Sequence, residues 1–222
     1  MVIVGAKGFA KEVLEILFQK KALQNLYFFD NLAPAPPDKL FGEFPVLRNM
    51  EAVKDVFLKT GDYTFTLGLG NPSLRYKLNK LFSEAGGIPT STISPTVEIG
   101  SFGNSIGTGC NILSGTIITN HVTIGTCCLI NPHCSISHDS VVGDFVEMSP
   151  GVRVTGGCTV GSFSVLGTNS SILPQVKLGV NVVVGAGAVV TKDVPDNSLV
   201  VGVPAVIKKN LAPLEFVTYV QL

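Results

Sequence analysis

The sequence contains little charge, no tryptophan and only three histidines in 222 residues. Its 16 basic and 16 acidic side chains balance, so no excess positive charge indicates a nucleic-acid partner or an anionic membrane surface. No run of about 18 apolar residues is present, which argues against a transmembrane helix. The short apolar start at residues 1–5 lacks the basic flank and cleavage site of a signal peptide, so we expect a cytoplasmic protein.

The five cysteines are also few, and they do not suggest a metal centre. In a cytoplasmic protein they need not pair, and their spacing does not match a zinc-finger pattern. Apolar residues, at 45%, and glycine, at 24 positions, are abundant. This composition indicates a well-buried globular protein with many tight turns and argues against disorder.

Residues 1–88 alternate between the signatures of strands and helices. Short apolar runs are followed by segments whose apolar residues recur at helical spacing, as in residues 13–17. The alternation predicts a small Rossmann-like α/β domain with a parallel sheet. The expected order is strand 2–4, glycine turn 5–8, helix 9–20, strand 26–29, proline-rich loop 34–37, helix 51–59, strand 63–69 and helix 71–85.

Residues 106–190 follow a six-residue repeat. Stepping by six from Ile106 to Val190, fifteen consecutive positions hold an aliphatic residue or methionine. The residues two positions earlier, such as Cys110 and Thr116, are small or β-branched almost throughout. Neither the helical nor the strand period produces this spacing, whereas stacked solenoid units do. Four of the five cysteines occupy the small position, so we interpret them as small hydrophobic residues and not as nucleophiles.

A period of 18 residues is superimposed on these hexads. The residue after the aliphatic position is glycine once in every three hexads, at Gly107, Gly125, Gly143, Gly161 and Gly179. Three hexads therefore make one coil of a three-sided prism with about five to six coils. One corner needs a residue without Cβ, either for a positive φ or because the turn is crowded. Ile93 and Ile99 predict an earlier coil, offset by one residue.

The hexads, together with the endings at residues 184–190 and 201–205, resemble the hexapeptide-repeat acyltransferases over residues 92–208. The resemblance implies a left-handed parallel β-helix at residues 89–208, after the α/β domain at 1–88 and before a C-terminal tail at 209–222. The repeat is specific for the fold but less so for activity, since structural proteins and hydratases share it. A prism with three flat apolar faces also suits a closed homotrimer, and we expect sites between its subunits.

The segment Ser137-His138-Asp139-Ser140 contains the best catalytic candidate, because acyl transfer needs a base that works near neutral pH. The run 131–150 resembles the hexapeptide branch of sialic-acid O-acetyltransferases and bacillosamine-pathway N-acetyltransferases. The resemblance implies that His138 is the general base and that Asp139 orients its ring. The family often has glutamate at the second position, one methylene longer. From the local sequence alone, an exposed turn is an equally good interpretation of His138.

The other two histidines leave alternatives open. His121 lies 18 residues before Asp139, so the two should stack on adjacent coils, where His121 could support the site. His133 is interpreted as a packing or subunit-contact residue. Its spacing from His138 also occurs in β-helical carbonic anhydrases, which bind zinc through three histidines. The stretch around Val97, where the third histidine would lie, contains none.

The same resemblance implies acetyl-CoA as co-substrate, in a groove between neighbouring prisms and without a metal. Its expected contacts are Glu147, Gly156, Gly167 and Gly185. The alternative for these glycines is that they only turn corners. Lys208 and Lys209 suit the phosphates of CoA or a solvated tail equally well.

Gly5-Ala6-Lys7-Gly8 follows a predicted strand and opens a predicted helix, so its free N–H groups and the helix dipole form a candidate anion site. An acidic residue at the end of the second strand accepts hydrogen bonds from a ribose or a base. Residues 5–11 resemble the N-terminal domain of the same acetyltransferase branch. The resemblance implies a nucleotide-sugar site with these contacts: Gly5, Lys7, Gly8, Phe9, Asp30, Asn31, Gly68 and Gly70.

Together these features predict an enzyme that transfers acetyl from acetyl-CoA to the 4-amino group of a UDP- or dTDP-linked amino-deoxysugar in surface-glycan synthesis. A sugar O-acetyltransferase acting on sialic acid is the alternative. A zinc hydratase or a non-catalytic β-helix is a more remote one. Neither a nucleic acid nor a membrane is expected as a partner.

Overall fold

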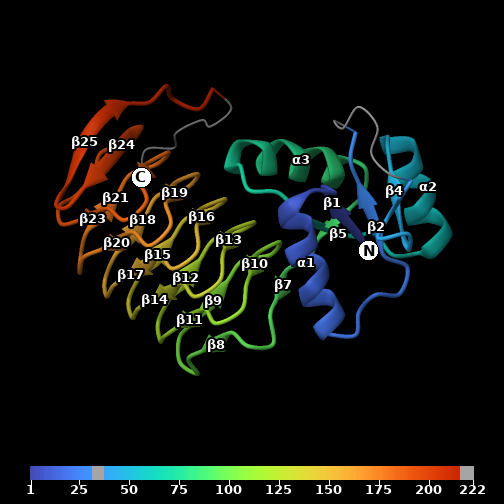
Figure 1. The fold of residues 1–222 in the computed structure, drawn as a ribbon, viewed down its shortest axis with the longest axis horizontal. Helices are drawn as coiled ribbons and strands as arrows, with labels where there is room; N and C mark the ends of the chain where they lie inside the picture. The colour runs from blue at the N-terminus through green and yellow to red at the C-terminus, as the bar shows by residue number, and fades with distance from the viewer. Residues whose placement is uncertain (32–37, 216–222) are drawn as a thin grey trace.

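The computed structural model describes residues 1–31 and 38–215, which form an α/β part joined to a long prism (Figure 1). The α/β part runs from blue to cyan-green and the prism from green to red. The proline-rich loop predicted at residues 34–37 and the end of the predicted tail, 216–222, lie outside the described residues. Within the described ranges, no helix is long and apolar enough to cross a lipid bilayer.

The N-terminal part is a six-stranded sheet with three helices. The strand order is β3-β4-β2-β1-β5-β6, and only β3 and β4 pair antiparallel. The elements are β1 (Val2–Val4), α1 (Gly8–Gln19), β2 (Tyr27–Phe29), β3 (Lys39–Leu40), β4 (Phe44–Leu47), α2 (Met50–Thr60), β5 (Thr64–Leu67), α3 (Pro72–Glu84) and β6 (Ile88–Pro89). The predicted α/β alternation is confirmed, whereas the short strands β3, β4 and β6 were not predicted.

Local sequence signals set the limits of these helices. Asn49 caps α2, because its side chain accepts the N–H three residues on at 2.8 Å, and Gly61 ends that helix with a φ of 67°. Asn71 caps α3 in the same way at 2.9 Å, with Pro72 at the first helical position. Helix α1 buries one apolar face: Ala10, Val13, Leu14, Ile16 and Leu17.

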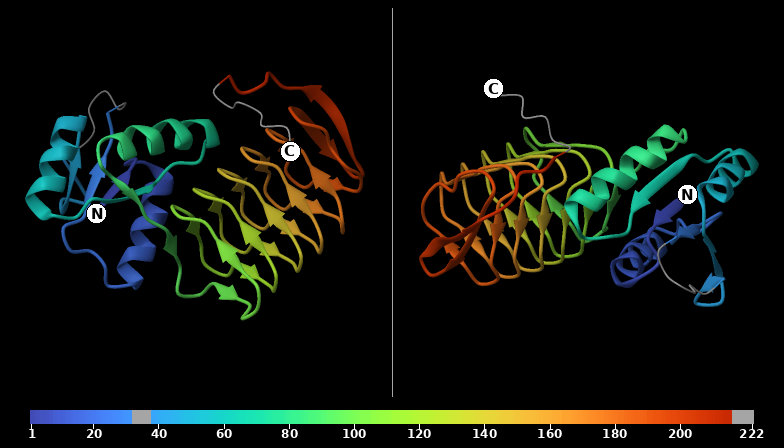
Figure 2. Two further views of the ribbon diagram at one scale, coloured as in Figure 1. Left: turned by 180° about the vertical axis from the view of Figure 1, so that it is seen from behind. Right: turned by 90° about the horizontal axis from the view of Figure 1, so that it is seen from above.

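Beyond Pro89 the chain coils into a three-sided prism with parallel strands of two residues each (Figure 2). The first face contains β7 (Thr92–Ile93), β10 (Asn111–Ile112), β13 (Leu129–Ile130), β16 (Glu147–Met148), β19 (Val165–Leu166) and β22 (Val183–Val184). The second contains β8 (Glu98–Ile99), β11 (Ile117–Ile118), β14 (Ser135–Ile136), β17 (Arg153–Val154), β20 (Ser171–Ile172) and β23 (Val189–Val190). The third contains β9 (Ser105–Ile106), β12 (Thr123–Ile124), β15 (Val141–Val142), β18 (Thr159–Val160) and β21 (Lys177–Leu178).

The register of the strands confirms the predicted repeat. Ile112 pairs with Ile130, which is 18 residues further along the chain. Ile93 pairs with Ile112, one residue more than a full coil, so the predicted offset is also present. The aliphatic position and the small position of the hexads both point inward, and together they form one continuous buried core. Stacking of the coils therefore supplies the core that no single hexad could form.

The corner glycines decide between the two reasons that the sequence left open. None of the five glycines spaced by 18 has a positive φ. A Cβ at Gly107 would instead lie 2.6 Å from the carbonyl carbon of Gly125 on the next coil, so crowding between coils is the reason for glycine. The positive φ values occur two residues later in the hexad. There the non-glycine corner residues, including His121, His133, Asp139 and Phe145, have φ between 52° and 66°.

A hairpin closes the end of the prism. Strand β24 (Ser198–Gly202) pairs with β22, and β25 (Ala205–Asn210) pairs antiparallel with β24. The sequence predicted neither strand, because the hexad pattern stops before them. Lys208 and Lys209 lie exposed on β25, so this stretch is a strand and not the start of a free tail.

The α/β part packs against the first face of the prism and the adjoining corner. Tyr76 of α3 stacks edge-on against the corner rings of Phe145 and Phe163, with centroids 5.5 and 5.8 Å apart. The buried Asn111 on β10 donates to the carbonyl of Leu67 at 2.8 Å and accepts from Thr66 at 2.9 Å. These contacts tie the end of β5 to the prism.

Candidate active site

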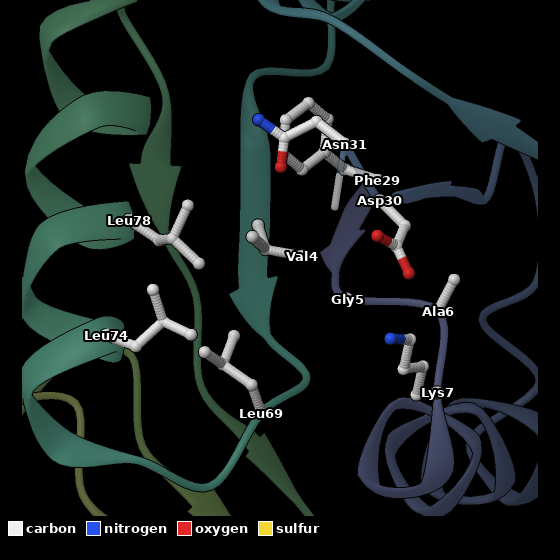
Figure 3. A pocket seen from close by; sticks show the side chains of 10 residues that line it. All are labelled: Val4, Gly5, Ala6, Lys7, Phe29, Asp30, Asn31, Leu69, Leu74 and Leu78. Carbon is white, nitrogen blue, oxygen red and sulfur yellow. The ribbon is translucent and has the colours of Figure 1, made fainter. Parts of the chain in front are cut away.

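The N-terminal glycine turn lines a cavity of about 240 Å³ (Figure 3). Lys7, at the start of α1, and Asp30, directly after β2, both project toward this cavity. Asp30 is buried and Lys7 is exposed. The remaining wall is largely apolar and includes side chains that the sequence did not single out: Val4, Phe29, Leu69, Leu74 and Leu78. A cavity with one cation, one carboxylate and apolar walls suits a nucleotide.

The turn is shaped for an anion at the start of α1. Gly5 has a φ of 114°, and a Cβ there would lie 2.7 Å from the carbonyl oxygen of Gly68, so only glycine fits. Lys7 occupies the N-cap of α1 without a side-chain cap, and no acidic residue stands in the first turn. The first N–H groups of α1 thus lack a capping side chain, which is the arrangement that binds phosphate groups.

Several predicted contacts of this pocket have other roles. Phe9 is not among the residues that line the cavity; it packs against the core of the α/β part and against a small cluster of Ile16, Leu113 and Leu129. Its contact with the nucleotide sugar stays a prediction. Gly8 begins α1 and has open space where a Cβ would lie.

The two glycines after β5 also serve packing. A Cβ at Gly68 would lie 2.8 Å from Ile3 and 2.9 Å from Ala10, so this glycine lets α1 approach the sheet closely. Gly70 faces the carboxylate of Glu147 on the prism. Leu69, which lies between them, is the residue of this loop that lines the cavity. The prediction selected its two glycine neighbours because they carry the resemblance to the family.

His138 and Asp139 form a hydrogen-bonded pair in the corner between β14 and β15. Nδ1 of His138 lies 2.8 Å from Oδ2 of Asp139, as predicted for a base and its orienting carboxylate. Asp139 has a φ of 60°, a conformation that aspartate tolerates better than most residues. The pair lines a second cavity, of about 330 Å³, with Gly156, Gly157, Pro174 and Gln175.

His121 joins this pair from the preceding coil. Its Nδ1 lies 2.8 Å from Oδ1 of Asp139, so the predicted stacking of these two residues is confirmed. The hydrogen bonds from His138 and His121 lower the pKa of Asp139 below its ordinary value. The carboxylate is therefore ionised at neutral pH and accepts a hydrogen bond from each ring.

His133 lies away from this cluster, on the corner between β13 and β14. Its ring packs over Gly115, where a Cβ would lie 2.5 Å from Nδ1, and its carbonyl accepts a hydrogen bond from Arg153.

In residues 1–31 and 38–215, no three His, Cys, Asp or Glu side chains are grouped so that they could hold a metal ion. Burial raises the pKa of Cys127 to about 12 and that of Cys134 to about 11, which disfavours either thiol as a nucleophile.

Three of the predicted cofactor contacts are glycines on the prism. Gly156 lies under the His138 ring, with a built Cβ only 2.6 Å from Cε1, so its glycine makes room for the imidazole. A Cβ at Gly167 would lie 2.6 Å from the amide nitrogen of Ala186, and one at Gly185 would meet Val201 at 2.9 Å. These close approaches fit the alternative interpretation, in which the glycines only turn corners, because a Cβ would clash there with the neighbouring coil or ring.

Glu147 lies half a coil from His138, on the first face, so within one chain the two residues do not share a site. Burial raises the pKa of its carboxyl group, and the positive charge of Arg75 partly opposes that rise. Arg75 itself is buried on α3 and donates to the carbonyls of Phe145 and Val146, at 2.6 and 3.1 Å. Glu147 thus stands at the junction of the α/β part and the prism.

The fold and these sites define a two-domain hexapeptide-repeat protein with a cavity at the glycine turn of its α/β domain and a histidine–carboxylate pair on its β-helix. Residues 1–81 match the family model described as the PglD N-terminal domain. This match supports the predicted resemblance for the first third of the chain, independently of the hexads.

Solved structures match nearly the whole chain. A histidine-to-asparagine variant of perosamine N-acetyltransferase from Caulobacter crescentus, in complex with CoA and GDP-perosamine, is 28% identical, with a TM-score of 0.86 over 94% of this chain and 96% of that one. WeeI from Acinetobacter baumannii AYE is 28% identical, with a TM-score of 0.82 over 93% and 100%. The acetyltransferase domain of PglB from Neisseria gonorrhoeae FA1090 is 25% identical, with a TM-score of 0.82 over 95% and 98%.

Among curated proteins, a galactoside O-acetyltransferase from Lactococcus lactis is 43% identical over 53 residues, and a putative acetyltransferase from Schizosaccharomyces pombe is 34% identical over 84. These alignments span 26% and 41% of those proteins. Together the comparisons confirm the predicted fold, a Rossmann-like domain followed by a left-handed β-helix, and the resemblance to the sugar acetyltransferase branch.

Proposed function

We propose that the protein transfers an acetyl group from acetyl-CoA to the 4-amino group of a nucleotide-linked amino-deoxysugar. The observation on which this rests is the hydrogen bond between His138 and Asp139 at the edge of a cavity large enough for reacting groups. The N-terminal anion pocket supplies the reason for a nucleotide-linked acceptor. The neighbour solved with CoA and GDP-perosamine, an amino-sugar nucleotide, supports the same pairing of substrates.

The nucleotide occupies the N-terminal cavity in this proposal. Its diphosphate meets the N–H groups at the start of α1 and the ammonium group of Lys7. The carboxylate of Asp30 accepts hydrogen bonds from the ribose or the base, with Asn31 beside it. Apolar contact with Phe29 and Leu69 completes the pocket.

The chemistry follows from the tautomer that Asp139 selects. The ionised carboxylate accepts the Nδ1–H of His138, which leaves Nε2 with a lone pair to take a proton from the sugar amine. As that proton moves, the amine nitrogen attacks the thioester carbonyl, and a tetrahedral oxyanion forms that backbone N–H groups stabilise. The intermediate collapses by breaking the C–S bond. The CoA thiolate leaves and receives the proton from His138, so no metal and no acyl-enzyme are required.

A homotrimer with shared sites explains the positions of the two cavities. The α/β domain covers the first face of the prism, whereas His138 stands at the corner between the second and third faces, half a coil away. In a closed trimer, the His138 corner of one subunit meets the domain junction of the next, where Glu147 stands. Acetyl-CoA then lies between prisms, with Gly156, Gly167, Gly185 and the exposed Lys208 and Lys209 along its course.

Cellular context belongs to the same proposal. Acetyl-CoA and nucleotide sugars are substrates of cytoplasmic enzymes, so we place the reaction in the cytoplasm. An acetylated amino sugar on a nucleotide carrier is an activated glycosyl donor. Surface-glycan synthesis is the process that uses such donors.

Sugar O-acetylation is the second candidate. Its support is the galactoside O-acetyltransferase, which matches a segment of this chain at 43% identity. A hydroxyl acceptor needs the same base and the same co-substrate. A free sugar would, however, leave the anion pocket at the start of α1 without a role.

The test is release of CoA from acetyl-CoA, measured with a thiol reagent across a panel of acceptors. The panel contains UDP-, dTDP- and GDP-linked 4-amino-sugars, free sialic acid, a galactoside and a blank that corrects for the protein's own cysteines. We expect release only with a nucleotide-linked amino-sugar, and a product heavier by one acetyl group. Release with sialic acid or the galactoside alone would replace this function by O-acetylation, and release with none would contradict both.

A further inference from the structure

The carboxylate of Asp139 is hydrogen-bonded to two imidazole rings at the prism corner that contains His138. Asp139 uses Oδ2 for His138 and Oδ1 for His121, each at 2.8 Å from a ring Nδ1. The first ring comes from the same turn and the second from the coil below. Both oxygens of the carboxylate are therefore engaged, on one edge of the cavity that also contains Gly156 and Gln175.

The hydrogen bond from His121 restricts rotation of the Asp139 side chain. The Asp139 side chain is 58% exposed, so packing alone does not fix its rotamer. Its own turn holds one oxygen against His138, and rotation about the side-chain bonds would break that contact. A second donor on the other oxygen makes any rotation cost two hydrogen bonds in place of one.

The backbone conformation places the His121 side chain next to Asp139. His121 and Asp139 occupy the same corner position on adjacent coils, with φ of 57° and 60°. The His121 ring also lies against Gly103, where a Cβ would approach its Cδ2 to 3.1 Å. Phe145 and Phe163 occupy the equivalent position at another corner, and their rings stack with centroids 5.2 Å apart and 7° between their planes. Side chains at this position therefore contact one another across adjacent coils.

We propose that His121 is a positioning residue, which holds Asp139 in the orientation that keeps His138 in its Nδ1–H tautomer with Nε2 free to act as base. The inference rests on the proposed function, since it takes His138 as the base. His121 touches neither reacting atom and acts only through Asp139.

The corner residues of the other coils supply matched variants. His121→Phe keeps an aromatic ring at a position where Phe145 and Phe163 already adopt the same φ, and it removes the N–H donor. His121→Gln keeps a donor, and Gln175 shows that glutamine tolerates this corner. His133→Phe is the control, because His133 occupies another corner with a φ of 59° and makes no contact with Asp139 that the structure records. Asp139→Asn removes the shared carboxylate at a φ that Asn169 also adopts.

The experiment is a double-variant cycle on acetyl transfer, with thermal unfolding and light scattering to check each variant. His121→Phe should lower kcat about tenfold, the effect of losing one hydrogen bond to a charged group, with KM unchanged. His121→Gln should recover most of that loss, and His133→Phe should leave kcat within about twofold. In the Asp139→Asn background, His121→Phe should add less than about twofold. An equal loss in both backgrounds, or no loss in either, would overturn the positioning role.

A second readout does not depend on turnover. Nitrogen-15 labelling of histidine reports which ring nitrogen of His138 carries the proton. We expect the Nδ1–H tautomer in the unaltered protein at pH 8 and a mixture of tautomers in His121→Phe. An unchanged tautomer in the variant would refute the inference even if the enzyme is active. If no acceptor is acetylated at all, the proposed function fails, and this spectrum still decides the role of His121.

Discussion

At the scale of single residues, the site depends on glycines that leave room for histidine rings. Gly156 lies beneath His138 and Gly103 beneath His121, and a built Cβ at Gly156 would lie 2.6 Å from Cε1 and 2.7 Å from Nε2 of the ring. Nε2 is the atom that takes the proton in the proposed reaction. A small displacement of the ring therefore removes the base from the reacting amine, since proton transfer needs hydrogen-bond geometry.

Gly156→Ala tests this directly. The exposed His138 ring can swing away from a new methyl group, so we expect the fold to survive while kcat falls by about 10²-fold, the lower end of what a positioned base contributes. Acetyl transfer and the thermal midpoint are measured on the same preparation. Gly115→Ala is the control: it displaces the His133 ring in the same way, and although its φ of 68° costs stability, its kcat should stay near wild type. Equal losses of kcat in both variants would show that the ring over Gly156 has no special role.

Sequence predicted the residues whose role follows from local chemistry, and it failed where packing decides. His138, Asp139 and Asp30 lie where the motifs placed them, because a carboxylate beside a histidine or at a strand end is visible in the chain itself. The surroundings of Phe9 could not be predicted, since whether its ring faces the pocket or the prism depends on how α1 docks. The apolar wall from α3, Leu74 and Leu78, left no signal, because these residues look like an ordinary helix face.

At the scale of elements, α3 joins the two halves of the molecule. The guanidinium group of Arg75 lies at the junction of the α/β part and the prism, where it donates to the carbonyls of Gly70, Phe145 and Val146. Burial lowers the pKa of this guanidinium group, which nonetheless stays charged at neutral pH because its ordinary pKa is very high. Arg75 thus joins two loops, one from each half of the molecule, and the carbonyls of Gly70 and Phe145 depend on it as their donor.

Arg75→Met should accordingly destabilise the protein. Methionine fills similar volume but leaves the carbonyls of Gly70 and Phe145 without the donor that Arg75 supplies, at a cost of about 3 kcal/mol in the free energy of unfolding. The matched control is Arg48→Met, because Arg48 pairs with Asp38 on the surface, where a salt bridge contributes less than about 1 kcal/mol. Urea unfolding monitored by circular dichroism compares the two variants. A loss no larger for Arg75→Met than for Arg48→Met would refute the importance of this contact.

Regular elements were predicted well where a period repeats and poorly where it stops. Fifteen hexad steps identify the prism, because each coil repeats the same burial. The strands β3, β6 and β25 escape prediction, since they contain too few residues to show a period or follow after the hexads end. Their pairing is decided by neighbouring strands that are distant in sequence.

At the scale of the whole molecule, the N-terminal cavity and His138 lie on different parts of one chain. The cavity is lined only by residues of the α/β part, whereas His138 stands at the prism corner between the second and third faces. In the proposed function these two places are halves of one reaction centre. Association around a threefold axis would bring unlike halves together, so we expect light scattering to report a trimer.

The most direct test of this account is activity in mixed trimers. His138→Asn removes the base, and Lys7→Glu places a negative charge against the diphosphate, so each homotrimer should be inactive at low acceptor concentration. Carrying different affinity tags, the two variants are co-expressed, and trimers with both tags are isolated. If sites are shared, one of the three sites in each mixed trimer combines an intact pocket with an intact base, and about a third of wild-type activity should return. Mixed trimers as inactive as their parents would contradict the shared site.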